Sequence, residues 1–193
     1  MRVVIDASVV VKWVLNDSER EPDTPRALQL LEGIRDGSVE PLQPAHWLAE
    51  VAAVVTRLRP EIAETTLDLL DAMELPMAAD LTIYKRASRL AAALNHHLFD
   101  TLYHAVALER DATLVSADVP YLRKAGHLGA ILALQAWGDS ASRSPGRMTR
   151  GKGGDWRSWC PLLTLTPRAA PSRPPPAGHT RRAARRAGPG RPA

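Results

Sequence analysis

The stretch His96–Leu122, HHLFDTLYHAVALERDATLVSADVPYL, decides the fold that the sequence predicts. We expect a helix that begins at Asp100, a short turn, and a strand over Thr113–Val115, with Asp118 just beyond the strand. In α/β folds, sites form in the crevice beyond the carboxyl ends of parallel strands. The two acidic residues at these element ends are therefore candidates for one functional site.

The rest of residues 1–137 alternates short apolar runs with amphipathic segments. Ser8 and Thr24 are the expected N-caps of the first two helices. Strands are predicted at 2–5, 75–77 and 130–134, with at most a short strand within 40–44. Further helices are predicted at 45–59, 61–73 and 80–94, and a short turn or helix at 120–124. Strands that alternate with helices imply a parallel sheet covered on both faces. We predict an α/β fold, a three-layer α/β/α sandwich with a central parallel sheet.

The composition fits one ordinary domain with material left over, since the chain has 193 residues and 45% hydrophobic content. Its longest apolar runs are too short to span a bilayer. Its first residues lack the apolar region and cleavage site of a secretory signal, so we expect a cytoplasmic protein without a membrane partner. The single cysteine, Cys160, excludes a disulfide framework and a cysteine-based zinc site within the chain.

The net charge of +4 hides an uneven distribution. Residues 138–193 hold 12 basic and two acidic side chains, whereas residues 1–137 hold 13 basic and 19 acidic ones. The basic character of the chain therefore belongs to its tail. The tail also holds nine of the 16 prolines and shows no apolar period. We predict a folded domain over 1–137 and a largely disordered tail over 138–193, in which 156–167 is a candidate for folding on a partner.

Four acids stand on separate predicted elements, namely Asp6 after the first strand, Glu50 within an apolar helix, Asp100 at a helix start and Asp118 after a strand. Mg²⁺ and Mn²⁺ are hard ions that favour oxygen ligands. A carboxylate cluster without an ion repels itself and raises the pKa of at least one member. A divalent ion removes that conflict and also activates water. We predict that the four acids meet around a divalent metal.

Each acid also has a purely structural explanation. Asp100 alone fits an N-cap or a charge that is favourable to the helix dipole. Asp118, two residues before Pro120, fits a turn. Asp6 is harder to explain in this way, because a carboxylate at the end of a buried strand needs a partner. Glu50 is the most informative of the four, since the helix pattern would place an apolar or small residue there.

Three blocks of the chain resemble the motifs of PIN-domain ribonucleases, and most closely those of the VapC toxins of bacterial toxin–antitoxin pairs. The blocks are DASVVVKWVLND at 6–17, PAHWLAEVAAVVTRL at 44–58 and FDTLYHAVALERDATLVSADVPYLRKA at 99–125. The resemblance covers about residues 1–137 and implies an α/β/α sandwich whose acids bind Mg²⁺ or Mn²⁺ and which cuts RNA. Carried over to this chain, the acidic positions are Asp6, Glu50, Asp100 and Asp118, and the positions of a hydroxyl near the metal are Ser8 and Ser116.

The mechanism that this resemblance implies is hydrolytic attack on phosphorus. Asp6, Asp100 and Asp118 would hold the ion, and Glu50 would orient or deprotonate the attacking water. Products would carry 5′-phosphate and 3′-hydroxyl ends. The implied partners are the RNA substrate and a small antitoxin whose C-terminal segment covers the acidic pocket. The implied assembly is a homodimer.

The histidines and tryptophans receive mainly structural explanations. His96 and His97 are expected as polar residues at a helix end rather than as ligands of a transition metal. His104 shares a helix face with Asp100 and is a candidate for contact with substrate. Two tryptophans are expected in the core or in a subunit contact rather than stacked on bases, namely Trp13 and Trp47.

Two other functions remain open at this point. One is a PIN-like nuclease that processes RNA outside any toxin system, and an adjacent antitoxin reading frame would argue against it. The other is a non-catalytic module that binds RNA or a structural ion, and Mn²⁺-dependent cleavage of single-stranded RNA would exclude it. A phosphatase-like hydrolase is disfavoured, because Asp6 is followed by Ala-Ser-Val with no second acid two residues on.

Overall fold

The computed structural model describes residues 1–15 and 23–139. Four strands form a central sheet in the order β2-β1-β5-β6, and every neighbouring pair is parallel. Their bounds are β1 Arg2–Ile5, β2 Glu40–Pro41, β5 Thr113–Ser116 and β6 Ile131–Ala133. A second parallel pair joins β3 (Gln43–Pro44) to β4 (Met77–Ala78).

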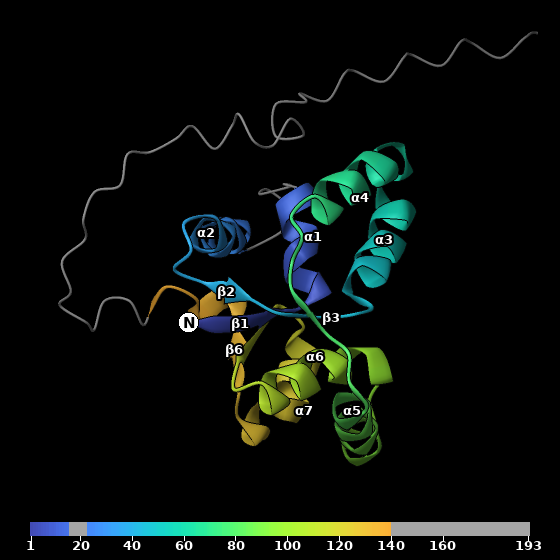
Figure 1. Ribbon diagram of the computed structural model, residues 1–193, viewed down its shortest axis with the longest axis vertical. Helices are drawn as coiled ribbons and strands as arrows, with labels where there is room; N and C mark the ends of the chain where they lie inside the picture. The colour runs from blue at the N-terminus through green and yellow to red at the C-terminus, as the bar shows by residue number, and fades with distance from the viewer. Residues whose placement is uncertain (16–22, 140–193) are drawn as a thin grey trace, which may run out of the picture.

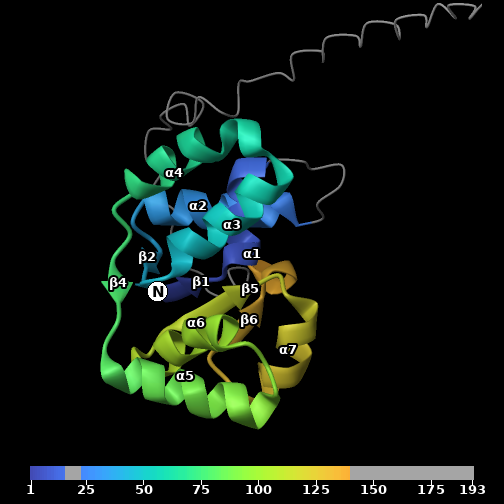
Figure 2. The same ribbon diagram turned by 90° about the vertical axis from the view of Figure 1, so that its right-hand side faces the viewer.

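Helices cover both faces of the central sheet, as Figures 1 and 2 show. One layer consists of α1 (Ala7–Leu15), α2 (Thr24–Arg35), α3 (Trp47–Leu58) and α4 (Ala63–Asp71). The other layer consists of α5 (Leu81–Leu94), α6 (Leu98–Glu109) and α7 (Val119–Ala125). Short 3-10 segments lie at Pro60–Ile62, Gly126–Leu128 and Leu134–Ala136. The predicted three-layer α/β/α sandwich with a parallel sheet is confirmed.

The two central strands carry the core and set the position of the acids. Residues 3–5 of β1 are fully buried, and so is Val115 of β5, because helices lie on both faces of the sheet. Ile5 pairs with Val115. The next residues along the two strands, Asp6 and Ser116, therefore emerge side by side at the carboxyl edge of the sheet.

A buried glutamine completes the pairing of β1 on its other side. Strand β2 pairs only with the first half of β1, at Arg2 and Val3. Beyond that point the fully buried Gln43 side chain takes over, since its Oε1 accepts the N–H of Ile5 at 3.0 Å and its Nε2 donates to the Ile5 carbonyl at 2.9 Å. Gln43 thus satisfies the backbone of the residue directly before Asp6.

The structure differs from the predicted helix starts at two places near the acids. The first helix begins at Ala7 instead of after a Ser8 cap, because Asp6 itself accepts hydrogen bonds from the first amides of the helix. The helix that contains Asp100 begins at Leu98, so Asp100 lies in its first turn rather than at its start. Both shifts leave the two acids at helix N-termini.

Two further expectations have different outcomes. Trp13 and Trp47 are buried in the core, as predicted. Of the predicted tail, Gly138 and Asp139 belong to the described residues and the remainder lies outside them, so the division into a domain and a disordered tail stays a prediction. Within the part of the chain that the structure describes, no helix combines the length and the apolar character needed to cross a bilayer.

Candidate active site

Asp6 is held at the carboxyl end of β1 by two hydrogen bonds. Its Oδ1 accepts the N–H of Ser8 at 2.8 Å, and its Oδ2 accepts the hydroxyl of Ser116 at 2.8 Å. The residue is only 8% exposed. Both oxygens of a buried carboxylate are therefore satisfied by neighbours from the next helix and the next strand, and the side chain has a fixed orientation.

The same network extends from Ser116 to the loop before α7. The Ser116 hydroxyl accepts the N–H of Asp118 at 3.0 Å, and the Ser8 hydroxyl accepts the N–H of Ala117 at 3.1 Å. Asp118 in turn caps α7, because its Oδ1 accepts the N–H of Tyr121 at 3.0 Å. The two predicted serines thus position the strand ends around Asp6, and Asp118 has a structural role besides any role in the site.

Glu50 and Asp100 lie in the first turns of α3 and α6, where the helix dipole favours negative charge. Each faces a histidine four residues earlier on the same helix. His46 Nε2 lies 3.5 Å from Glu50 Oε2, and His96 Nε2 lies 3.0 Å from Asp100 Oδ2. Neither contact has the alignment of a hydrogen bond, so the buried Oε2 of Glu50 and both Nε2 atoms lack hydrogen-bond partners.

The pKa shifts show that the four acids share one electrostatic environment. Burial raises the pKa of Asp6 to about 6, against the hydrogen bonds from Ser8 and Ser116, and Glu50 adds repulsion. Burial and the charge of Glu50 raise the pKa of Asp100, His96 opposes that rise, and Asp118 adds to it. The structure therefore brings together acids from β1, from the helical layers on both faces, and from the end of β5.

Two buried tyrosines lie among these acids. Burial raises the pKa of Tyr103 far above its usual value, and the charges of Glu50 and Asp6 raise it further. The pKa of Tyr121 is raised by burial and then by Asp100, Asp6 and Asp118. Both hydroxyls thus stay protonated. The Tyr103 hydroxyl has no hydrogen-bond partner and is available as a donor beside the carboxylates, whereas the Tyr121 hydroxyl is bonded to His104 Nδ1.

The chemistry of this donor set suits a hard divalent ion. It consists of carboxylate oxygens, one of which is buried without a hydrogen bond. Among the described residues, no group of three or more acidic, histidine or cysteine side chains is close enough to hold an ion as it stands. Mg²⁺ keeps several of its waters when it binds to proteins, so one or two carboxylates suffice as direct ligands. The residues fit an ion that is bound largely through water.

His104 does not take the role that its helix position predicts. It is fully buried, its Nε2 contacts the Gly129 carbonyl at 2.8 Å and its Nδ1 contacts the Tyr121 hydroxyl at 3.0 Å. The carbonyl can only accept, so Nε2 carries the proton and Nδ1 accepts from the tyrosine. Burial lowers the pKa of His104. His104 is a neutral structural residue, and the prediction of substrate contact is wrong.

Sequence reasoning missed the residues that flank Glu50 and Asp100. The spacing of four residues between His46 and Glu50, and again between His96 and Asp100, is a signal that was available. Lys124 was missed for a different reason, since its contact is tertiary. Its Nζ donates to the Asn95 carbonyl at 3.0 Å and lies 3.4 Å from His96 Nδ1.

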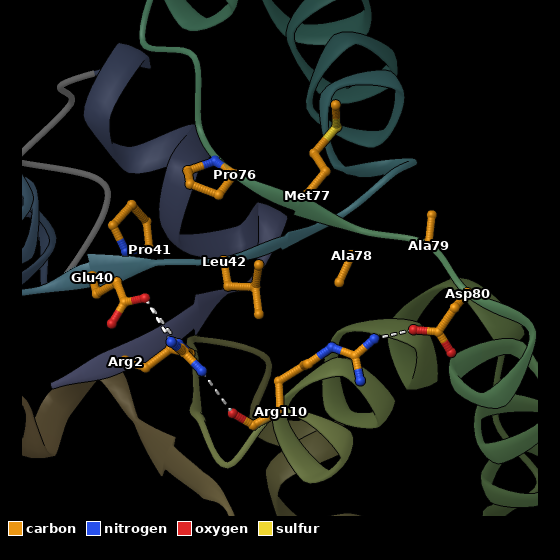
Figure 3. A pocket seen from close by; sticks show the side chains of 10 residues that line it. All are labelled: Arg2, Glu40, Pro41, Leu42, Pro76, Met77, Ala78, Ala79, Asp80 and Arg110. Atoms are coloured by element: carbon orange, nitrogen blue, oxygen red, sulfur yellow. Dashed lines mark hydrogen bonds and ion pairs between the residues drawn. The ribbon is translucent and has the colours of Figure 1, made fainter.

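A pocket lies at the other end of β1, away from the acids (Figure 3). Arg2 opens β1 and donates to Glu40 at 2.7 Å and to the Arg110 carbonyl at 3.3 Å, and Arg110 pairs with Asp80. The charges that line this pocket are thus balanced by one another. The four acids of the candidate active site lie instead at the carboxyl edge of the sheet.

The sequence profile of the PIN domain matches residues 3–126, which is more than half of the chain. The chain belongs to the PIN-domain family. No curated protein matches its sequence. The PIN domain is a nuclease fold, and PIN-domain nucleases generally use divalent metal ions. The family match therefore places the chain in a class of nuclease folds, the PIN domains.

Proposed function

We propose that this protein is a Mg²⁺- or Mn²⁺-dependent endoribonuclease that hydrolyses RNA phosphodiester bonds in the cytoplasm and serves as the toxin of a toxin–antitoxin pair. The single observation that supports the catalytic part is the placement of Asp6, a buried carboxylate held at the carboxyl end of β1 by Ser8 and Ser116, whose pKa is raised to about 6 mainly by burial. Carboxylates held close together at a strand end repel one another, and a bound cation would relieve that repulsion. The same placement is where α/β folds form their sites.

In this proposal, Asp6, Asp100 and Asp118 hold the ion directly or through water. When bound, the ion supplies a water of lowered pKa and neutralises charge on the phosphate. Glu50, whose Oε2 has no hydrogen bond, accepts a proton from the attacking water or orients it. Ser116 and Ser8 keep Asp6 and the strand ends in place. The products carry 5′-phosphate and 3′-hydroxyl ends.

The test of catalysis uses purified full-length protein and single-stranded RNA. We expect cleavage with Mn²⁺, no cleavage with chelator, and loss of cleavage in Asp6→Asn and Asp100→Asn. The matched control is Asp68→Asn, because Asp68 is an exposed acid of α4 outside the cluster. Circular dichroism establishes that each variant is folded. Equal cleavage by folded Asp6→Asn protein contradicts the assignment, and binding without cleavage favours a non-catalytic module.

The toxin role and its partners rest on the resemblance of the three sequence blocks to VapC toxins. We propose a homodimer and a small antitoxin whose C-terminal segment covers the acids. Induced expression of the wild-type protein is expected to arrest growth, and co-expression of the neighbouring antitoxin frame is expected to relieve the arrest. Cleavage of RNA without growth arrest would favour an RNA-processing nuclease instead. Mapping of new 5′ ends in cellular RNA, with Asp6→Asn as control, identifies the targets.

A further inference from the structure

Exposed apolar side chains gather at the two chain segments that carry Asp100 and Asp118. Leu98, Phe99 and Val119 are 42%, 59% and 38% exposed, and each lies within two residues of one of these acids. Phe99 is the single phenylalanine of the chain and stands directly before Asp100. Its exposure excludes a role in the core, so its position at the rim of the site needs another explanation.

The ring of Phe99 is the outermost of three aromatic rings that lead to the acids. Its centroid lies 5.2 Å from that of His46, with an angle of 38° between the ring planes. The His46 ring meets Tyr103 edge-on at 5.0 Å. Tyr103 is 1% exposed and senses the charge of Glu50. His46 therefore packs against Phe99 from the inner side, while most of the Phe99 surface stays open to water.

This arrangement matches what a nucleobase needs. A nucleotide whose phosphate reaches the acids can place its base at the first turn of α6, because one sugar joins the base to the phosphate. Single-stranded nucleic acids bind proteins by stacking bases on aromatic side chains, and this stacking is tolerant of sequence. A base within a duplex is already stacked on both sides and cannot use such a platform unless it leaves the helix.

We propose that Phe99, supported by His46, is the stacking platform for one unpaired base next to the scissile phosphate. This inference rests on the proposed nuclease function and adds to it a residue that binds one base of the substrate. Phe99 is a binding residue here, and the acids keep the chemistry. Its removal is expected to raise KM far more than it lowers kcat.

The expected loss of affinity is substantial. Alanine in place of a stacking aromatic weakens binding of single-stranded nucleic acid by about 5- to 160-fold. We expect such a loss in Phe99→Ala, a smaller loss in Phe99→Leu, which keeps apolar bulk without an aromatic face, and near wild-type binding in Phe99→Trp. The matched control is Leu81→Ala, since Leu81 is 65% exposed in the first turn of α5. That control is expected to bind RNA as the wild type does.

The decisive experiment is a double-substitution cycle on full-length protein with an RNA oligonucleotide that the wild type cleaves. Affinities are measured in the Asp6→Asn background so that the RNA stays intact. Each base near the cleavage point is removed in turn by an abasic nucleotide. At one position, removal of the base is expected to weaken RNA binding by the protein that retains Phe99. The same removal is expected to leave RNA binding by the Phe99→Ala variant unchanged. A fluorescent base analogue at that position is expected to be quenched only when Phe99 is present.

Two results overturn the inference while the proposed function stands. One is an RNA affinity of Phe99→Ala that equals that of the wild type. If that variant has instead lost binding to a protein partner, Phe99 belongs to a protein interface. The other is a loss of affinity that is the same for every abasic position, which would mean that no particular base meets the ring. Absence of RNA cleavage by the wild-type protein is visible before any variant is made, and it overturns the proposed function together with the inference.

Discussion

The buried carboxyl group of Asp6 is costly to ionise in the folded protein. In the unfolded chain its pKa is near 3.8, and in the folded protein burial raises that pKa to about 6. Between these values the folded state keeps a proton that the unfolded state has released. The contribution of Asp6 to stability is therefore complete at low pH and is lost as pH rises through about 6.

We predict that Asp6→Asn stabilises the metal-free protein at pH 7, because a neutral amide replaces a buried charge. The shift of Asp6 corresponds to roughly 3 kcal/mol in the free energy of unfolding. Urea unfolding in chelator at pH 4.5, 5.5 and 7 measures the difference between wild type and variant. His104, whose burial lowers its pKa, acts in the opposite direction in both proteins and cancels in that difference. A difference that is constant over this pH range contradicts the prediction.

Gln43 stabilises the fold through the two hydrogen bonds that its side chain makes with the backbone of Ile5. Substitution Gln43→Leu keeps the volume and leaves the buried N–H and carbonyl of Ile5 without partners. We expect a loss of about 2–4 kcal/mol in the free energy of unfolding, measured with urea. The control Gln135→Leu changes an exposed glutamine and is expected to be close to neutral. Equal stability of both variants would show that water replaces the Gln43 amide.

At the scale of an element, α5 depends on one cap. Asp80 Oδ1 accepts the N–H groups of Thr82 and Ile83 at 2.9 and 3.2 Å, and the same side chain pairs with Arg110. Asp80→Ala is expected to lower the free energy of unfolding by about 1 kcal/mol. Asp80→Asn keeps the capping oxygen and loses only a half-buried ion pair, so it should cost less. Thermal denaturation of the two variants side by side checks this order.

The elements that sequence reasoning predicted well are those whose signal is local. The apolar run of β1, the strand β5 and the Asp80 cap of α5 each lie in a few consecutive residues. The strands β3 and β4 have two residues each, too few to show a period, and the strand predicted at 75–77 overlaps β4 only at Met77. The roles of Gln43 and His104 were beyond prediction, because their partners lie 38 and 25 residues away in sequence. For the site, the sequence singled out the four acids, whose role stays a prediction, and it did not single out the histidines beside Glu50 and Asp100.

At the scale of the whole molecule, the charges of domain and tail have opposite sign. Residues 138–193 hold 12 basic side chains, so we expect them to add salt-sensitive affinity for RNA without sequence preference. A truncated chain should end after Asp139, since Arg26 Nη1 donates to its Oδ1 at 3.0 Å. We predict an unchanged melting temperature, weaker RNA binding, and a shallower dependence of affinity on salt. RNA binding that is unchanged by the truncation contradicts this role of the tail.

The pairing of β1 with β5 also determines how late during synthesis the candidate site can form. The hydrogen bond between Ser116 and Asp6 spans 110 residues, and Asp118 comes two residues later still. While the protein is being synthesised, its first strand has left the ribosome long before the strand that pairs with it exists. An enzyme that cleaves RNA would thus stay harmless to the message that encodes it until nearly the whole domain has emerged.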